Sequence, residues 1–530
     1  MLCLEKRIVI RVKDSINNKD TLVSMSKGEN LLETLASSKL SIFSECGGRG
    51  TCGKCIVKVV EGRLKITLQD KASFSTSELE GGYRLACMAY PDMDCTIILS
   101  SRRNTDYKVV TETLNHPTNT EYSKIKETSH PHTLTYEKKA YAIAIDLGTT
   151  TIALALTDLP GGNILDKYTA INPQRVYGAD VVSRIKASNE GKLNSLALLI
   201  REELLKGILK LGEKNQIKIE SIDNIVIAGN TTMIHLLMGY PCNTLGTFPF
   251  APYKDGFINL LSDEIFGISE KIPITLIPGI SVFVGGDITA GLLACGINRE
   301  DKPCLFIDLG TNGEIALGNR ERILATSTAA GPAFEGGNIS CGVGSIPGAI
   351  CHVSYEEGKL SYKTINEEPA VGLCGTGVVE LISELLKEGI IDSSGLLKDS
   401  YFDEGYPIAG MKFIQKDIRE LQLAKAAIGA GVDILVKSYG ISYEEIDKVF
   451  IAGGFGYHLD INKAAMIGLI PEALTRKAIA VGNTSLAGAI YLIKDSDTKN
   501  KIEHIILTAE EVHLSNVEGF NELFMRYMSF

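Results

Sequence analysis

Hydrophobic and polar positions alternate with a period of two in several short runs near the start of the chain. Runs with the alternation of half-buried strands occur at 7–13 (RIVIRVK), 21–25 (TLVSM), 56–62 (IVKVVEG) and 95–101 (CTIILSS). A short helical pattern, LLETLASS, follows Gly28-Glu29-Asn30. We therefore expect residues 1–101 to form a small β-rich domain with a helix after its second strand.

The pattern changes twice beyond this segment. Residues 102–139 are polar and rich in Thr and Lys, with few large apolar side chains. Such a composition buries too little surface to offset the entropy of ordering, so we interpret this stretch as a linker. From 140 to 530, apolar runs alternate with glycine-rich turns and helical stretches, which indicates α/β architecture.

The α/β region contains an internal repeat. AIAIDLGTTTIALAL at 142–156 and CLFIDLGTNGEIALG at 304–318 share the order strand, Asp-Leu-Gly-Thr, turn, strand. NIVIAGNTTM at 224–233 and KVFIAGGFGYH at 448–458 form a second pair, in which an apolar run ends in Ala-Gly and a turn. Repeated units in a fixed order predict two similar lobes that face one cleft.

Composition narrows the classes of function. The 530 residues include 54 Lys+Arg and 64 Asp+Glu, a formal charge of −10, and this acidic balance argues against general nucleic-acid binding. No run of about 18 apolar residues is free of charges and Gly or Pro breaks, so we expect no membrane span. Charges also stand where a signal peptide needs an apolar run, and we expect a cytoplasmic protein.

Half of the twelve cysteines lie in the first hundred residues. Cys46, Cys52 and Cys55 have the spacing C-x5-C-x2-C on a glycine-rich loop, and Cys87 is a fourth thiol further along. Four thiolates in this arrangement fit a [2Fe–2S] cluster. A structural zinc site and thiols without metal are the alternatives, although zinc ribbons prefer two C-x2-C pairs and one occurs here.

The cysteine loop resembles that of ferredoxins, and its five-residue first gap is similar to the adrenodoxin type. This resemblance covers about residues 5–100 and implies the β-grasp fold of that family. Cys3 and Cys95 lie outside the pattern, and we interpret each as a plain thiol.

Two repeated turns have the chemistry of a nucleotide site. Asp146 and Asp308 each end an apolar run, where a carboxylate can hold Mg²⁺ through water and position the attacking water. The residues after them can offer N–H groups and hydroxyls to phosphates; they are Gly148, Thr149 and Thr150 in one turn and Gly310, Thr311, Asn312 and Gly313 in the other.

A later glycine-rich turn completes the set. Gly453, Gly454 and Gly456 in AGGFG allow the backbone to lie against a base or ribose, because glycine has no Cβ. Any one such turn alone is better interpreted as an ordinary tight turn. The three in this order resemble the phosphate-1, phosphate-2 and adenosine motifs of the ATPase superfamily of acetate and sugar kinases, Hsp70 and actin. Neither GxxxxGK[ST] nor a strand–GxGxxG–helix pattern occurs.

Further segments extend the resemblance to one family. They include AGNTTMIHLLMG (228–239), GGDITAG (285–291), AAGPAFEGGNISCG (329–342), LCGTGVVELI (373–382) and GNTSLAGA (482–489). Together with the cysteine loop they are similar to the reductive activators of corrinoid proteins. One departure is the short polar stretch at 102–139, where longer members carry a compact extra domain.

The family resemblance implies a multidomain protein: a β-grasp [2Fe–2S] ferredoxin domain (α+β) at 1–101, a linker at 102–139 and a two-lobed α/β, actin-like or Hsp70-like ATPase domain at 140–530. It implies a [2Fe–2S] cluster, ATP and Mg²⁺ as cofactors. It also implies ATP-dependent transfer of one electron that returns a partner's cob(II)alamin to cob(I)alamin for methyl transfer. The expected partners are a corrinoid protein and a low-potential electron donor. A second copy of the chain, giving a homodimer, is a further candidate partner.

Several residues keep two interpretations. Lys425 in DIRELQLAKAAI is assigned to the adenosine by resemblance, with a solvated helical lysine as the alternative. Asp287 is a cleft residue or a helix cap, and Glu335 sits in a glycine-rich turn that can face the nucleotide. The isolated His235 and His352, like His458, are expected to be structural.

Two other functions are weighed against reductive activation. The first is an ATP-gated electron donor to another low-potential enzyme, as in the activators of 2-hydroxyacyl-CoA dehydratases, but those place a [4Fe–4S] cluster between subunits and lack a ferredoxin domain. The second is a redox-responsive, Hsp70-like ATPase module, but no substrate-binding β-domain is expected after the nucleotide part. Iron and acid-labile sulfide content separates a corrinoid activator from the dehydratase-type donor. The response of ATP turnover to a corrinoid protein separates the activator from the Hsp70-like module.

Overall fold

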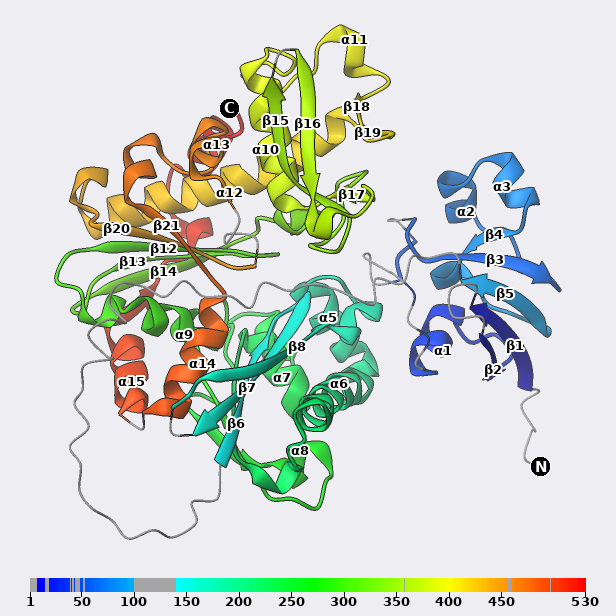
Figure 1. Ribbon diagram of the computed structural model, residues 1–530, viewed down its shortest axis with the longest axis horizontal. Coiled ribbons are helices and arrows are strands. Elements are labelled where there is room, and N and C mark those ends of the chain that lie inside the picture. The colour runs from blue at the N-terminus through cyan, green and yellow to red at the C-terminus, as the bar shows by residue number, and fades with distance from the viewer. Residues whose placement is uncertain are drawn as a thin grey trace. The chain divides into compact units, whose positions relative to one another are not determined.

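The computed structural model describes residues 7–14, 19–38, 40, 42, 48–50, 53–99, 140–159, 161–356, 358–454, 459–495 and 497–530. Contacts divide the chain into two compact units (Figure 1). One unit comprises residues 1–105 with 172–200, and the other comprises residues 106–171 with 201–530. The linker expected at 102–139 lies outside the described residues.

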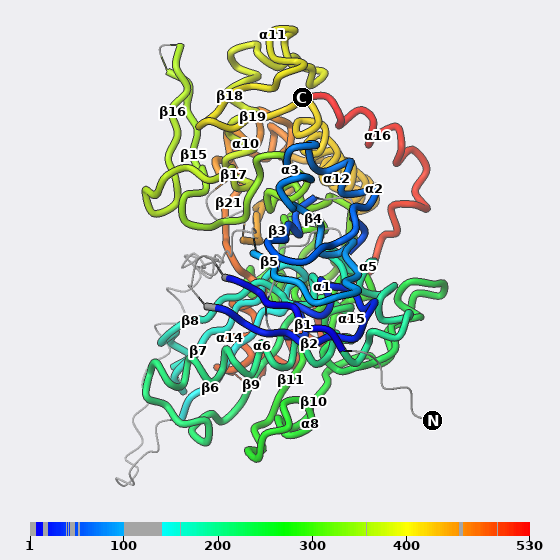
Figure 2. The backbone as a smooth tube through the Cα atoms, turned by 90° about the vertical axis from the view of Figure 1, so that its right-hand side faces the viewer, coloured from blue at the N-terminus to red at the C-terminus, as the bar shows by residue number. Residues whose placement is uncertain are grey.

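Five strands form the sheet of the N-terminal domain (Figure 2). In spatial order they are β2 (Lys19–Ser26), β1 (Arg7–Asp14), β5 (Cys95–Leu99), β3 (Ile56–Glu61) and β4 (Tyr83–Leu85). The alternation in β1 places Ile8, Ile10 and Val12 in the core. β1 pairs antiparallel with β2 and parallel with β5, and this mixed sheet confirms the expected β-grasp fold.

The described part of this domain also contains the helices α1 (Leu31–Ser37), α2 (Leu68–Ser73) and α3 (Thr76–Glu80). Helix α1 begins after Asn30, whose side chain accepts hydrogen bonds from the N–H groups of Leu32 and Glu33. The sequence predicted α1 and four of the five strands. It missed β4, α2 and α3, because elements of three to six residues are too short for a periodic pattern to show.

The larger unit contains two six-stranded sheets. The first has the order β10 (Ile258–Leu261), β11 (Pro273–Leu276), β9 (Ile222–Gly229), β6 (Ala140–Leu147), β7 (Thr151–Leu159) and β8 (Ile164–Ile171). The second has the order β21 (Ala478–Gly482), β20 (Lys448–Ala452), β12 (Cys304–Leu309), β13 (Gly313–Gly318), β14 (Ile323–Thr328) and β22 (Ala509–Glu511).

Five strands of each sheet follow one plan. β6, β7 and β8 are joined as an antiparallel meander, and β9 and β11 add in parallel beside β6. β12, β13 and β14 form the same meander, with β20 and β21 in parallel beside β12. The internal repeat therefore corresponds to two lobes of the same topology, and the expected actin-like architecture is confirmed.

Helices α9 (Gly286–Cys295) and α14 (Thr484–Lys494) pack against each other and share one core with residues of both sheets. The sheet residues of this core are small where they meet the helices: Ala142 and Ala144 in β6 and Ala153 and Ala155 in β7. A Cβ atom at Gly488 would lie 2.2 Å from the carbonyl oxygen of Ala290. Glycine is therefore needed for the two backbones to approach this closely.

Further helices and strands complete the two units (Figure 1). Between β8 and β11 the chain forms α5 (Val181–Ala187), α6 (Leu193–Asn215), α7 (Thr231–Met238) and α8 (Ser262–Phe266). The remaining elements are β15 (Ala349–Glu356), β16 (Lys359–Thr364), β17 (Gly372–Leu373), α10 (Gly375–Lys387), α11 (Asp399–Phe402), β18 (Tyr406–Ile408), β19 (Met411–Phe413), α12 (Gln415–Tyr439), α13 (Ile461–Met466), α15 (Thr498–Thr508) and α16 (Phe520–Tyr527).

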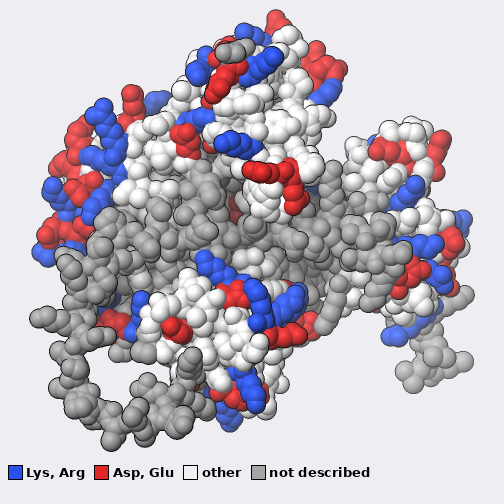
Figure 3. Space-filling view, in the orientation of Figure 1, with Lys and Arg blue, Asp and Glu red and all other residues white. Residues whose placement is uncertain are grey.

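Acidic and basic side chains are interspersed over the face drawn in Figure 3. Among the described residues, no helix is both long enough and apolar enough to cross a bilayer.

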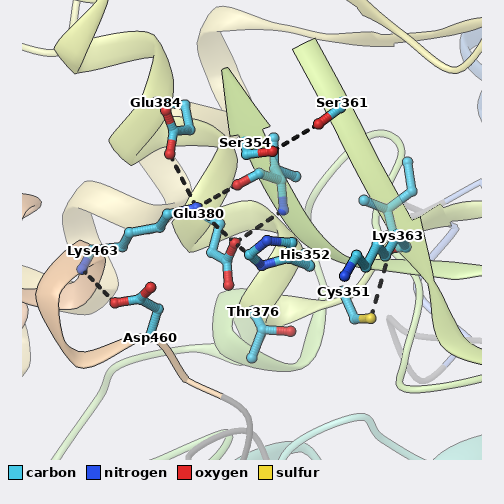
Figure 4. Close-up of polar contacts among 12 residues, drawn as sticks. Cys351, His352, Ser354, Ser361, Lys363, Thr376, Glu380, Glu384, Asp460 and Lys463 are labelled. Atoms are coloured by element: carbon cyan, nitrogen blue, oxygen red, sulfur yellow. Dashed lines mark hydrogen bonds and ion pairs between the residues drawn. The ribbon is translucent and has the colours of Figure 1, made fainter. Parts of the chain in front are cut away.

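A buried charge network joins α13, α10 and β15 (Figure 4). The ammonium of Lys463 donates to Glu380 at 2.9 Å and to Glu384 at 3.0 Å, and it also donates to the carbonyl of Val353. Glu380 accepts a further bond from the Val353 N–H, and its carboxylate lies 2.8 Å from Nδ1 of His352. Burial lowers the pKa of Lys463, but the bonds to the two carboxylates outweigh it and the pKa is raised.

Replacing Lys463 by Met should destabilise the protein strongly. The change leaves Glu380 and Glu384 buried without their ammonium partner, and loss of one member of a buried pair costs about 3 kcal/mol or more. Urea denaturation followed by circular dichroism measures the change in the free energy of unfolding. Lys387→Met is the matched control, because Lys387 is exposed and 3.9 Å from Glu384, and it should cost less than about 1 kcal/mol. Equal losses in the two variants would contradict the prediction.

Candidate functional site

A cavity of about 160 Å³ lies where the repeated turns of the two sheets meet. It is lined by the turn after β6, the turn after β12 and the glycines after β20, together with residues at the starts of α7, α9 and α14. Helix N-termini carry partial positive charge and free N–H groups, which favour anions such as phosphates. The cavity thus combines backbone donors with carboxylate side chains.

Asp146 ends β6 and is held from the start of α14. The Asn483 side chain donates to one carboxylate oxygen at 2.8 Å, and the Ser485 hydroxyl donates to the other at 2.8 Å. Burial raises the pKa of Asp146, while these two hydrogen bonds lower it in part. The carboxylate is therefore fixed in position before any ligand arrives.

Asp308 ends β12 and lies among other carboxylates. Burial, together with the charges of Asp287, Asp146 and Glu335, raises its pKa to about 8. Burial and the charge of Asp146 likewise raise the pKa of Asp287 to about 7. The lining residues include five carboxylates, and no Lys, Arg or His is among the described residues that line the cavity. This donor set calls for a cation.

The two phosphate-type turns are joined directly across the cavity. The hydroxyls of Thr150 and Thr311 lie 2.9 Å apart, and both donate to the carboxylate of Glu335, with a distance of 3.1 Å from Thr150. Thr150 belongs to the first lobe and Thr311 to the second. Glu335 therefore lies at the nucleotide-type cavity, as its glycine-rich turn suggested.

Gly453 brings the third turn against the second. Its φ is +93°, a region that favours glycine, and a Cβ atom there would lie 2.7 Å from the Leu309 carbonyl oxygen and 2.8 Å from Oδ1 of Asp308. Any other residue at 453 would thus push this part of the backbone away from Asp308.

Most of the residues expected from the sequence to bind nucleotide line this cavity. They are Asp146, Gly148, Thr149, Thr150, Asp308, Gly310, Thr311, Asn312, Gly453 and Gly454. Gly313 does not line it, because it packs into the core: a Cβ atom there would lie 2.1 Å from Ile428. Gly456 lies outside the described residues. Asp287, which had two interpretations, also lines the cavity.

The structure places Lys425 elsewhere. Its ammonium is fully buried, donates to the carbonyl of Tyr527 at 2.6 Å and to that of Ser529 at 2.5 Å, and lies 5.1 Å from the centre of the Phe530 ring. Burial lowers the pKa of Lys425 to about 8. In the described residues this lysine anchors the segment after α16, and neither interpretation made from the sequence included that role.

Two asparagines at the site were not singled out from the sequence. Asn230 caps α7 by accepting from the Met233 N–H and donates to the Thr149 hydroxyl at 2.9 Å. Asn483 caps α14 in the same way while it holds Asp146. The signal was present, because Gly-Asn-Thr follows a strand at both places. Comparing 229–231 with 482–484 would have found a further internal repeat. Glu314, which also lines the cavity, was missed as well.

The cysteine loop is described in part. Cys55 and Cys87 are buried beside the same core, the Ala86 N–H donates to the Cys55 carbonyl, and the Asn30 side chain donates to the Cys87 carbonyl at 2.8 Å. Cys46 and Cys52 lie outside the described residues. Cys95 is on β5 in the core, and burial raises the pKa of its thiol to about 11. That environment is one of a plain buried thiol.

The residues fit Mg²⁺ bound together with a nucleotide. Among the described residues no three His, Cys, Asp or Glu side chains form a metal site by themselves. Mg²⁺ needs fewer, since it keeps several waters and usually binds one or two carboxylates plus substrate phosphates. Asp146 and Asp308 offer those carboxylates.

Comparison with protein families divides the chain into three matched segments. Residues 14–92 match the 2Fe-2S iron-sulfur cluster binding domain, residues 141–300 the RACo middle region, and residues 302–530 the C-terminal ASKHA domain of RACo. The middle-region match begins at residue 141 and so does not include 102–139.

Similar proteins cover nearly the whole chain. The corrinoid activation enzyme RamQ of Eubacterium limosum is 32% identical over 90% of this chain and 92% of its own length. The [Co(II) methylated amine-specific corrinoid protein] reductase of Methanosarcina barkeri is 27% identical over 74% of this chain and 77% of its own. A solved structure, the reductive activator for corrinoid, iron-sulfur protein, matches with a TM-score of 0.69 and 28% identity over 98% of both chains. The chain therefore belongs to the family of reductive activators of corrinoid proteins.

Proposed function

We propose that this protein uses ATP to drive one electron from an N-terminal [2Fe–2S] domain to a partner corrinoid protein, returning cob(II)alamin to cob(I)alamin for methyl transfer. The observation that carries the proposal is the carboxylate-lined cavity between repeated Asp-Leu-Gly-Thr turns, in a chain whose relatives act on corrinoid proteins. The electron comes from a low-potential donor, and the protein works in the cytoplasm.

The cofactors of this reaction follow from the donor groups. Cys46, Cys52, Cys55 and Cys87 would hold the [2Fe–2S] cluster, which supplies one-electron chemistry when bound. Asp146 and Asp308 would hold Mg²⁺ on the nucleotide phosphates. The turns at 148–150 and 310–312, with the starts of α7, α9 and α14, supply backbone and hydroxyl donors for the phosphates.

The threonine bridge gives nucleotide a way to act on conformation. Thr150, Thr311 and Glu335 bond one another across the two lobes, in the place where phosphates would bind. A nucleotide that takes over these hydroxyls replaces a protein contact by a ligand contact, so the lobes need not keep the same spacing with and without it. Ligand binding shifts a conformational equilibrium only through such differential contacts. We therefore place the ATP-driven step in the relative position of the two lobes.

The cluster assignment makes a direct prediction. Cys87→Ser should lose the cluster, because one iron loses a thiolate ligand, whereas Cys95→Ser should keep it, since Cys95 is a core residue of β5. Iron content, acid-labile sulfide and visible absorption of protein purified without oxygen measure both variants. A bleached Cys95→Ser protein beside an intact Cys87→Ser protein would reverse the assignment.

Asp308→Asn should bind nucleotide yet hydrolyse it slowly. The amide keeps the size of the side chain but loses the charge that anchors Mg²⁺ and the attacking water, and loss of such a group lowers kcat on the order of 100-fold. Steady-state phosphate release gives kcat, and titration with a fluorescent ATP analogue gives affinity. Asp301→Asn is the control, because Asp301 is an exposed carboxylate paired with Arg320, and its kcat should be normal. Unchanged turnover in Asp308→Asn would remove this residue from the site.

Coupling of ATP to reduction is the sharpest test of the function. The reduced protein mixed with a cob(II)alamin-loaded corrinoid protein should leave most of the cobalt as Co(II), and adding Mg-ATP should produce Co(I), followed by its absorption. Asp308→Asn should keep its cluster spectrum and fail to respond to ATP. Full reduction without nucleotide would refute ATP dependence. A response with a different low-potential acceptor and none with any corrinoid protein would favour the ATP-gated donor instead.

A further inference from the structure

A second and larger cavity opens beside the nucleotide cavity and is not used by the proposed function. Its volume is about 750 Å³, within the range of sites that hold small organic ligands. It is formed by the 248–256 segment, by 276–286 and by residues near the end of α15 and after β22. All of these residues belong to the larger compact unit.

The lining of this cavity is unusually aromatic for a surface. The rings of Phe248 and Phe250 lie 6.4 Å apart, those of Phe250 and Phe283 5.4 Å, and those of Phe283 and His513 6.3 Å, so four rings follow one another along the wall. Phe248 is 87% exposed, and Phe250 and Phe283 are each 40% exposed. Phenylalanines of this kind are normally buried, and a cluster of them around a cavity marks a binding site.

The 248–256 segment, which carries Phe248 and Phe250, is held in place. His235, on α7, accepts a hydrogen bond at Nε2 from the Tyr253 N–H and lies 3.1 Å at Nδ1 from the Pro241 carbonyl. Burial lowers the pKa of His235, so the ring is neutral and serves both bonds. Phe250 has a φ of +54°, a strained conformation for a bulky residue that surrounding contacts must maintain. The rings are thus presented in a preformed arrangement.

The two cavities share a wall one backbone thick. Gly229 and Thr231 line the aromatic cavity, while Asn230 between them lines the nucleotide cavity. Gly286 likewise lines the aromatic cavity, and the next residue, Asp287, lines the nucleotide cavity. A movement of this shared backbone therefore changes the shape of both cavities.

A chain of hydrogen bonds crosses the wall. Asn230 donates to the Thr149 hydroxyl on the phosphate side. Thr231 donates to the Ser281 carbonyl at 2.9 Å on the aromatic side, and the Ser281 hydroxyl accepts from the Phe283 N–H at 3.2 Å. The phosphate turn and one ring of the aromatic wall are thus connected through two consecutive residues of α7 and its cap.

We propose that this cavity binds an uncharged planar aromatic molecule and that its binding strengthens nucleotide binding through the Asn230–Thr231 wall. Aromatic walls favour a flat ring by stacked and edge contacts. The charged lining residues gather no single sign, since Lys254 is next to Asp255 in the chain and Glu511 lies 3.4 Å from the His513 ring, so the cavity offers no cluster of charge to a charged ligand. A ligand that holds Phe283 and Ser281 in place also holds Thr231 and Asn230, and so orders the phosphate turn in advance. The proposal goes beyond the proposed function and rests on one part of it, the binding of nucleotide in the neighbouring cavity.

Indole is the probe for the site. The chain has no tryptophan, so the fluorescence of indole can be followed against the purified protein without a matching protein signal. Phe283→Ala and Phe248→Ala should each weaken indole binding about tenfold or more, because each removes a ring contact. Phe402→Ala is the matched control, since Phe402 is 45% exposed and lies outside the cavity, and it should bind indole normally. Cyclohexanol, which is uncharged but not aromatic, should not displace the probe.

Coupling is measured by titrating the nonhydrolysable analogue AMP-PNP with Mg²⁺ in the presence and absence of saturating indole. Affinity for the analogue should rise about fivefold or more, and indole affinity should rise by the same factor when the analogue is bound. Thr231→Val keeps the shape of the side chain but removes its bond to Ser281, so both ligands should still bind while the coupling factor falls toward one. Thr157→Val removes a similar threonine-to-carbonyl bond elsewhere and should leave the factor unchanged.

Three results would overturn the proposal: no indole binding, equal displacement by cyclohexanol, or nucleotide affinity that indole leaves unchanged or weakens. None of these results tests the function proposed above, which is tested by cobalt reduction. Conversely, indole binding and coupling would stand if the corrinoid reaction failed.

Discussion

The nucleotide cavity depends on the close packing of α9 against α14. The two helices approach until only a glycine fits at 488, where a Cβ atom would meet the Ala290 carbonyl. Asp287 stands in the first turn of α9, and Asn483 and Ser485 stand at the start of α14. The helix separation therefore sets where these polar groups lie relative to Asp146. Alanines on the facing strands allow the helix pair to fit against the sheets, so small residues in the core position the charged residues of the site.

The carboxylates of the cavity are held at an electrostatic cost. Burial disfavours the charged forms of these carboxylates. Repulsion from Asp146 also raises the pKa of Asp287, and repulsion from Asp287 and Asp146 raises that of Asp308. Two side-chain donors from α14 compensate Asp146 and two threonine hydroxyls compensate Glu335, whereas burial and repulsion dominate at Asp287 and Asp308. Such an arrangement does not serve folding, because uncompensated buried charge destabilises a protein. A cationic ligand would offset this cost, and the Mg²⁺ that we propose to accompany the nucleotide phosphates is such a ligand.

The repeat made the ATPase fold and most of its cavity predictable from the sequence. Asp146 and Asp308, with the glycines and threonines after them, lie at strand ends whose apolar runs are unmistakable, and the two turns repeat one another. Lys425 could not be placed in this way. A lysine in a helical pattern gives no sign of which segment will cover it, and its partners at 527 and 529 are backbone carbonyls, which carry no sequence signature. The aromatic cavity was missed for a related reason: Phe248, Phe283 and His513 come from distant segments and meet only after folding.

ATP can drive the reduction only if the free energy that couples nucleotide binding to the position of the lobes is large enough. Moving one electron through about 100 mV corresponds to about 2.3 kcal/mol, and coupling between two sites in a protein is typically about 1–3 kcal/mol. A nucleotide that takes over the hydroxyls of Thr150 and Thr311 replaces two hydrogen bonds to the Glu335 carboxylate, and hydrogen bonds to a charged group are each worth about 1.5–3 kcal/mol. The cavity therefore holds enough differential contact to shift a one-electron equilibrium by the order of 100 mV. Under the proposed function, a change in lobe spacing would therefore suffice for a cobalt couple about 100 mV below that of the cluster.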